Sequence, residues 1–317
     1  MLQIGCSSFF GLGATSLLEQ RAALAANAVA PIQRAKSVVL VFLTGGGSHI
    51  DMFDPFVLKD DPNKADFKVQ GLSLIDGLNT ERLERRRALL TKAISSEAAL
   101  SDTESGRQFS DQFDAAYSML TTGRLKKAFE IDQETSEVRE RYGRNRLGQT
   151  LLLARRMIEA EILVVQCNMG IVQSWDTHVD HFPRLTNTLL PPTDQSVSAL
   201  LDDLVDRGLL DSTLVIIVGE FGRTPTISPL SNQAVPGRHH WAHGYTAVFS
   251  GAGVRGGQVI GKTDRTGGYP VTVPWSPSDN GATVFDALGI PLESDLHNRL
   301  GRPYRLNRGK VIDSLYT

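Results

Sequence analysis

The chain has 317 residues, of which 41% are hydrophobic, and its formal net charge at pH 7 is −2. This length and apolar content are enough for the core of one α/β domain with excursions. The near-neutral charge argues against nucleic acid or an anionic membrane as the main partner, because both attract basic surfaces.

Residues 1–30 have the composition of an export signal. Ile4–Leu18 is mildly apolar and rich in glycine and serine, and two alanine-rich small-x-small triplets follow within residues 23–28. The apolar stretch is too short and too polar for a transmembrane helix. Its weak hydrophobicity is typical of twin-arginine leaders, whose arginine pair we expect before the first residue. We therefore predict a periplasmic or extracellular protein, with an amphipathic N-terminal helix as the alternative.

The first core strand is predicted over Ser37–Thr44 (SVVLVFLT). A continuous apolar run rich in β-branched residues is typical of a strand buried on both faces of a parallel sheet. It continues into Gly45–Asp51 (GGGSHID), which places Asp51 just beyond the carboxyl end of the strand.

A helical excursion is predicted over about residues 79–160. Glu81–Ser95 has leucines on one rough helical face and charges on the other, and Asp111–Thr121 and Arg124–Ile131 are shorter helical patterns. Leu147–Ala160 then leads into the second strand.

Polar residues also follow the carboxyl ends of two further predicted strands. Ile162–Asn168 (ILVVQCN) leads to the sequence Ser-Trp-Asp-Thr-His, and Leu214–Val218 runs directly into Gly-Glu-Phe-Gly-Arg. Cys167, inside the first of these strands, is expected to be a buried thiol. The polar residues that follow the two strands are Asp176, His178, Glu220 and Arg223.

Helices are also predicted between the later strands. Pro191-Pro192 is expected to interrupt a helical pattern, so that Thr193 or Asp194 caps the next helix. Ser278-Asp279 is expected to cap the last helix. Strands that alternate with helices predict a mostly parallel central sheet with flanking helices and right-handed crossovers, in a single domain over residues 35–317.

The carboxyl ends of parallel strands meet at one edge of a sheet, which is where α/β proteins bind ligands. Carboxylates and imidazoles together form the ligand set of a divalent metal, and these donors suit Zn²⁺ or Mn²⁺ better than Mg²⁺ or Ca²⁺. For Glu220 and Arg223, at the end of the third strand, the alternative to a ligand site is a structural ion pair between the two side chains. The residues expected to converge are Asp51, Asp176, His178, Glu220 and Arg223.

The segment Gly237–His243 (GRHHWAH) holds three of the seven histidines and precedes another predicted strand, Tyr245–Ser250. We expect it at the same sheet edge. A solvated loop or a pair of helix caps would also account for such a run.

These residues give the chain a resemblance to the bacterial family catalogued as domain of unknown function 1501, usually grouped with the alkaline phosphatase and sulfatase-like fold. The resemblance implies an alkaline phosphatase-like core, divalent metals at the strand ends, and hydrolysis of a phosphate or sulfate ester, either a small anionic ester or a modified glycan. The matching stretches are Ala35–Pro55, Leu83–Leu90, Arg139–Arg156, Trp175–His178, Gly219–Pro225, Gly237–Trp241, Gly253–Arg265 and Gly301–Pro303.

The resemblance also implies roles for individual residues. Arg223 would stabilise the negative charge that develops on the ester oxygens. Phe221 and His239 depart from the pattern, since the first stands where phosphatases carry a histidine and the second where an acidic residue is expected. The residues that resemble metal ligands are Asp51, Asp176, His178, Glu220 and His240.

The largest departure lies at Asp54-Pro55, where the family has a long additional segment that would carry a core strand and the nucleophile. Ser48 and Thr177 are the hydroxyls near the ligand clusters, but neither stands in the nucleophile context of the superfamily. A lost strand would leave an opening in an incomplete sheet. Together with the predicted export signal, the resemblance implies an exported metal-dependent hydrolase, with a non-catalytic secreted binding protein of the same fold or an inactive deletion product as alternatives.

Overall fold

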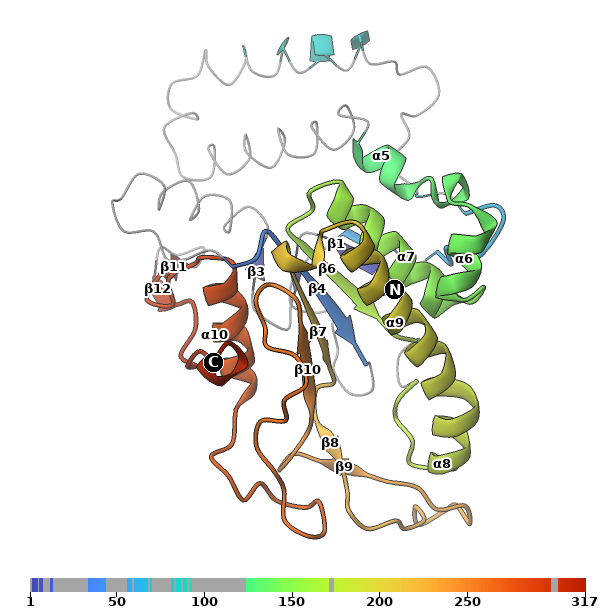
Figure 1. Ribbon diagram of the computed structural model, residues 1–317, viewed down its shortest axis with the longest axis vertical. Helices are drawn as coiled ribbons and strands as arrows, with labels where there is room; N and C mark the ends of the chain where they lie inside the picture. The colour runs from blue at the N-terminus through green and yellow to red at the C-terminus, as the bar shows by residue number, and fades with distance from the viewer. Residues whose placement is uncertain are drawn as a thin grey trace.

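The computed structural model contains a sheet with helices on both faces (Figure 1). Figure 1 shows α7 (Arg146–Glu159) and α9 (Leu190–Asp206) on one face and α10 (Pro277–Ala287) on the other. The residues that the structure describes are 2–4, 6–7, 12–13, 34–43, 56–58, 60–67, 69, several positions between 81 and 92, 124–170, 174–297 and 302–317.

The sheet has six strands in the order β10-β7-β4-β6-β1-β5. β4 pairs in parallel with β6 on one side and β7 on the other, whereas β10, β1 and β5 are antiparallel to their neighbours. The predicted α/β fold with a mostly parallel core sheet is confirmed for the four strands from β10 to β6. The strands are β1 (Leu2–Ile4), β4 (Ser37–Phe42), β5 (Phe56–Leu58), β6 (Val164–Asn168), β7 (Thr213–Val218) and β10 (Ala247–Ser250).

Shorter elements surround this sheet. The described positions between 81 and 92 are helical, in agreement with part of the predicted excursion. Among the described residues, the other helices are α5 (Arg124–Phe129), α6 (Ser136–Tyr142) and α8 (His181–Arg184). A π-helical turn lies at Leu185–Leu189, and short 3₁₀ helices lie at Ile131–Gln133, Leu210–Ser212 and Asp313–Leu315. The two-stranded pairs are β2 (Cys6–Ser7) with β3 (Leu12–Gly13), β8 (Gly222–Arg223) with β9 (His240–Trp241), and β11 (Asp295–His297) with β12 (Pro303–Arg305).

Two helix starts differ from the sequence prediction. α9 begins at Leu190, so Pro191-Pro192 lies in its first turn instead of interrupting it. The π-helical turn Leu185–Leu189 lies directly before α9, so the two prolines, which have no amide proton to donate, follow a local change in the helical hydrogen-bond pattern. α10 is capped by Ser276 in a reciprocal capping box with Asp279, two residues earlier than predicted.

The core strands β4, β6 and β7 are buried on both faces, as the apolar runs predict. Val39 and Val41 pack among residues of the α7 and α9 layer, whereas Val38 and Leu40 pack against the α10 layer. This alternation follows from the period of two in a β-strand. Cys167 is fully buried, as predicted, and burial raises the pKa of its thiol to about 12. The core strands are therefore fixed from both sides.

The N-terminal strand β1 pairs with β6 and β5, so β6 has a neighbour on each side. Cleavage of the export signal predicted over residues 1–30 would remove this strand from the sheet. The Asp54-Pro55 junction lies outside the described residues. Among the helices that the structure describes, none has the length and hydropathy needed to cross a membrane.

A buried guanidinium joins the helices of one layer. The Arg155 side chain on α7 is 1% exposed, and its Nη1 donates to Glu159 Oε2 at 2.7 Å. Its Nη2 lies 2.8 Å from Glu134 Oε2 and its Nε lies 2.8 Å from Asp203 Oδ2, as ion pairs without aligned hydrogen bonds. Tyr142 also donates to Asp203 Oδ2, at 3.0 Å. The cluster therefore ties α6, α7 and α9 together.

Two carboxylates of this cluster, those of Glu134 and Asp203, are held in their charged forms. Burial raises the pKa of Glu134, but the guanidinium groups of Arg155 and Arg156 outweigh it and the pKa is lowered. Burial likewise raises the pKa of Asp203, and Arg207, Arg155 and the Tyr142 hydroxyl outweigh it.

Arg155→Ala should destabilise the fold by about 3–5 kcal/mol, because it leaves buried carboxylates without a counter-charge. Arg141→Ala is the matched control, since Arg141 pairs with Asp202 and Asp206 on the surface and such pairs contribute roughly 0–1 kcal/mol. Urea unfolding measures both free energies. Equal losses in the two variants would contradict a structural role for the buried cluster.

The same cluster predicts a loss of stability in acid. The pKa values of Glu134 and Asp203 are lower in the folded than in the unfolded state. Their contribution to the free energy of unfolding is therefore fully present above their unfolded pKa values of about 4, and it disappears as the pH falls through the folded pKa values. The free energy of unfolding should therefore fall between about pH 5 and pH 2. Glu134→Gln, which cannot ionise, should show a smaller fall over this range, and an unchanged fall would count against the cluster.

Candidate metal centre

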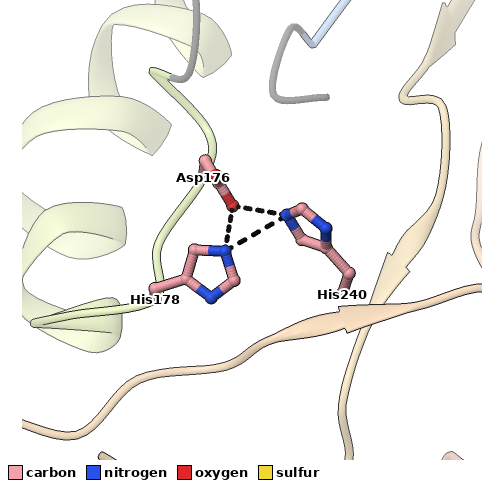
Figure 2. A group of neighbouring side chains, drawn as sticks. All are labelled: Asp176, His178 and His240. Carbon is pink, nitrogen blue, oxygen red and sulfur yellow. Dashed lines mark hydrogen bonds and ion pairs between the residues drawn. The ribbon is translucent and has the colours of Figure 1, made fainter. Parts of the chain in front are cut away.

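Three side chains from distant parts of the sequence meet at the carboxyl edge of the sheet (Figure 2). Asp176 and His178 follow β6, and His240 lies on β9, beyond β7. Asp176 Oδ1 lies 3.0 Å from His178 Nε2 and 2.9 Å from His240 Nε2, and the two Nε2 atoms are 3.2 Å apart. One donor atom from each residue thus lies within 4.8 Å of the others.

This triangle of donors fits a divalent cation. Ligands bound tetrahedrally at 2.0–2.1 Å lie roughly 3.3 Å from one another, which is close to the three separations in the triad. Two ring nitrogens that face each other need a proton or a cation between them, because both cannot direct lone pairs at one another without cost. Two imidazoles and one carboxylate favour Zn²⁺ or Mn²⁺ over Mg²⁺ or Ca²⁺.

Arg223 provides a positive charge beside the triad. Its Nη1 lies 2.5 Å from Asp176 Oδ1, and its Nη2 donates to the Trp175 carbonyl at 3.0 Å. A second donation, from Nη1 to the Arg238 carbonyl at 3.3 Å, fixes the guanidinium plane. The ion pair of Arg223 is therefore formed with Asp176, and the described residues include no pair between Arg223 and Glu220.

The pKa values of Asp176 and His178 suit metal binding. Burial raises the pKa of Asp176, but Arg223 and His240 outweigh it, so the pKa lies below the ordinary range. Burial lowers the pKa of His178, and the nearby positive groups lower it further against the opposing effect of Asp176. At neutral pH Asp176 is ionised and His178 is neutral, which are the forms that bind metals.

A close backbone approach brings the histidine segment to the Asp176 loop. A Cβ atom at Gly237 would overlap the carbonyl group of His178 and crowd the carbonyl oxygen of Thr177. The next amide, that of Arg238, donates to this Thr177 oxygen at 3.1 Å. Glycine is required here for space, since any side chain would force the two segments apart.

The short β8–β9 pair fixes the other side of the site. Arg223 and His240 are direct cross-strand partners, and the Thr224 amide donates to the His239 carbonyl at 2.9 Å. A Cβ atom at Gly222 would overlap the Gly244 carbonyl. The residues after β7 therefore hold the histidine segment in a defined register.

A cavity of 320 Å³ lies next to Arg223. Glu220 lines it, and Glu220 Oε2 is buried with no hydrogen-bond partner among the described residues. Its lining residues are Leu43, Trp175, Gly219, Glu220, Phe221, Gly222, Arg223, Gly244, Tyr245 and Thr246.

Asp176, His178 and His240 lie together, as the sequence predicts, and Arg223 contacts them. Glu220 is not part of the donor group within 4.8 Å, and it lines the neighbouring cavity instead. Asp51 lies outside the described residues.

Two hydroxyls, those of Ser48 and Thr177, stand close to the ligand clusters in the sequence. Ser48 lies outside the described residues. Thr177 Oγ1 is buried and shares a 2.6 Å hydrogen bond with His181 Nδ1.

Two residues outside the triad, His239 and Ser228, were given no role in the site from the sequence. His239 contacts the His178 ring, and Ser228 contacts His239. The histidine-rich segment Gly237–His243 indicates His239 as a candidate, whereas no sequence motif indicates Ser228.

The fold and this site define an α/β protein with a candidate divalent-metal centre at the carboxyl edge of its sheet. The chain belongs to the family described as "Protein of unknown function (DUF1501)", which matches residues 56–316. No curated protein and no solved structure matches the chain. The matched range begins directly after Asp54-Pro55, the junction at which the sequence predicts a missing segment.

Gly237→Ala should abolish or strongly weaken metal binding, because the new Cβ meets backbone atoms of His178 that cannot rotate away. Gly256→Ala is the matched control, since a Cβ there meets nothing within 4 Å. Zn²⁺ affinity is measured by competition with a chromophoric chelator, and circular dichroism checks the fold. Wild-type affinity in Gly237→Ala would show that the close approach does not shape the site.

Proposed function

We propose that this protein is an exported metal-dependent hydrolase of phosphate or sulfate esters. The observation that carries the proposal is the triad of Asp176, His178 and His240, whose donor atoms lie within 4.8 Å of one another. Arg223 lies against this triad and also lines the 320 Å³ cavity. A cation-binding triad, a fixed guanidinium and a cavity are together suited to an anionic ester.

Each group has a defined part in this proposal. A divalent ion held by the triad would polarise an ester oxygen and lower the pKa of a bound water, so that no side-chain nucleophile is required. Arg223 is held by the Trp175 and Arg238 carbonyls, and its planar guanidinium suits phosphate or sulfate oxygens. The cavity volume is near the lower end of the roughly 300–1,000 Å³ common for ligand pockets. The substrate is therefore proposed to be a small anionic ester or the modified end of a glycan.

The alkaline phosphatase and sulfatase-like arrangement would add a second metal ion, and Glu220 and Asp51 are proposed as its ligands. The support from this chain is the buried Glu220 Oε2, which has no hydrogen-bond partner among the described residues. A buried carboxylate oxygen in this condition requires a cation or a proton.

A non-catalytic exported protein that binds its ligand at the same site is the second candidate. It is supported by the engagement of Thr177, the described hydroxyl closest to the triad in the sequence, with His181. Under this alternative the triad binds a metal and an anionic ligand without turnover. An inactive deletion product would lack both properties.

The test is to remove metal with a chelator, restore Zn²⁺ or Mn²⁺, and assay p-nitrophenyl phosphate, bis-p-nitrophenyl phosphate and p-nitrophenyl sulfate. We expect turnover only after a metal is restored. Asp176→Ala should lose both metal and turnover because it removes the donor that contacts both histidines. Arg85→Ala is the control, since Arg85 is exposed and its ion pair among the described residues is with Glu81, one helix turn away.

The outcomes separate the candidates. Metal uptake with turnover supports the hydrolase, and metal uptake without turnover on these esters and on sulfated glycans supports the binding protein. A wild-type protein that takes up no divalent metal would overturn both.

A further inference from the structure

A chain of hydrogen bonds leads away from the triad through two residues that have no part in the proposal above. His178 Nδ1 lies 2.8 Å from His239 Nδ1, and His239 Nε2 lies 3.0 Å from Ser228 Oγ. The rings of His178 and His239 are stacked, with centroids 5.1 Å apart and an interplanar angle of 27°. All three residues are partly shielded from solvent.

The proton positions along this chain follow from the metal site. A hydrogen bond between two ring nitrogens needs a proton on one and a lone pair on the other. His178 Nε2 faces Asp176 and His240, and it can bind a metal only through its lone pair. The ring proton of a metal-binding His178 must therefore be on Nδ1. His239 Nδ1 must then accept a hydrogen bond from this N–H group, so the ring proton of His239 lies on Nε2. The hydroxyl oxygen of Ser228 accepts it.

We propose that His239 and Ser228 form an outer hydrogen-bond chain that holds His178 in its metal-binding tautomer. The inference rests on the proposed metal site, and it makes His239 a positioning residue and not a ligand. An outer partner of this kind fixes the ring orientation and increases the basicity of the ligating nitrogen.

The backbone builds the chain in advance of any ligand. The His239 amide donates to Thr224 Oγ1 at 3.0 Å, and the His239 carbonyl accepts from the Thr224 amide at 2.9 Å. Ser228 and Gly237 exchange two backbone hydrogen bonds of 3.1 Å each. Both outer residues are therefore fixed by the same loop that delivers His240 to the triad.

Two substitutions of His239 separate positioning from packing. His239→Asn places its Oδ1 where Nδ1 was and keeps an acceptor for His178, whereas His239→Gln reaches the level of Nε2 and Ser228 but offers no acceptor to His178. Both remove the imidazole, so a loss of packing affects both. We expect the Asn variant to bind Zn²⁺ nearly as well as wild type, and the Gln variant to bind it about 10–100-fold more weakly.

Competition with a chromophoric chelator measures these affinities. Long-range ¹H–¹⁵N NMR of the Zn²⁺-loaded wild type should show the proton of His178 on Nδ1 and that of His239 on Nε2. Equal affinities of the Asn and Gln variants, or the reversed tautomers in which His239 Nε2 accepts from Ser228, would overturn the inference while the metal site stands. Absence of Zn²⁺ uptake by wild type would overturn the proposed function and this inference together.

Discussion

The site depends on a backbone contact between two loops that leave different strands. At Gly237 the histidine segment lies directly against the carbonyl of His178, and the Arg238 amide bonds to Thr177. This contact places His240 and His239 on the two nitrogens of the His178 ring. Without it His240 would lie on a loop apart from Asp176 and His178, and no donor triangle would exist.

The sheet makes that contact possible. β6 and β7 both run parallel to β4, so the loops after them emerge at one edge. Both faces of these strands are buried, and the buried Arg155 cluster ties together the helices that cover one face. A buried guanidinium with three carboxylates adds little net stability over apolar packing, but it penalises any arrangement that separates the charges. The cluster therefore fixes the helical layer behind the strand that carries the Asp176 loop.

The sequence predicted the parts of the protein that depend on local pattern. The apolar runs at Ser37–Thr44, Ile162–Asn168 and Leu214–Val218 correspond to β4, β6 and β7, because buried strands need continuous apolar residues. Asp176, His178 and His240 were also predicted, since each follows such a strand or belongs to the histidine run. The parts that depend on packing were not predicted. Strand β1 forms by pairing with β6, which is distant from it in the sequence. The contact of Ser228 with His239 depends on the shape of a loop that no sequence motif predicts.

The central claim is that Asp176, His178 and His240 bind one divalent ion. The most direct test is anomalous diffraction at the zinc edge from crystals soaked with Zn²⁺. The account predicts a peak within bonding distance, about 2.0–2.2 Å, of Asp176 Oδ1 and of both Nε2 atoms. A fully soaked crystal with no peak at the triad, or with its only ordered zinc bound elsewhere, would contradict it.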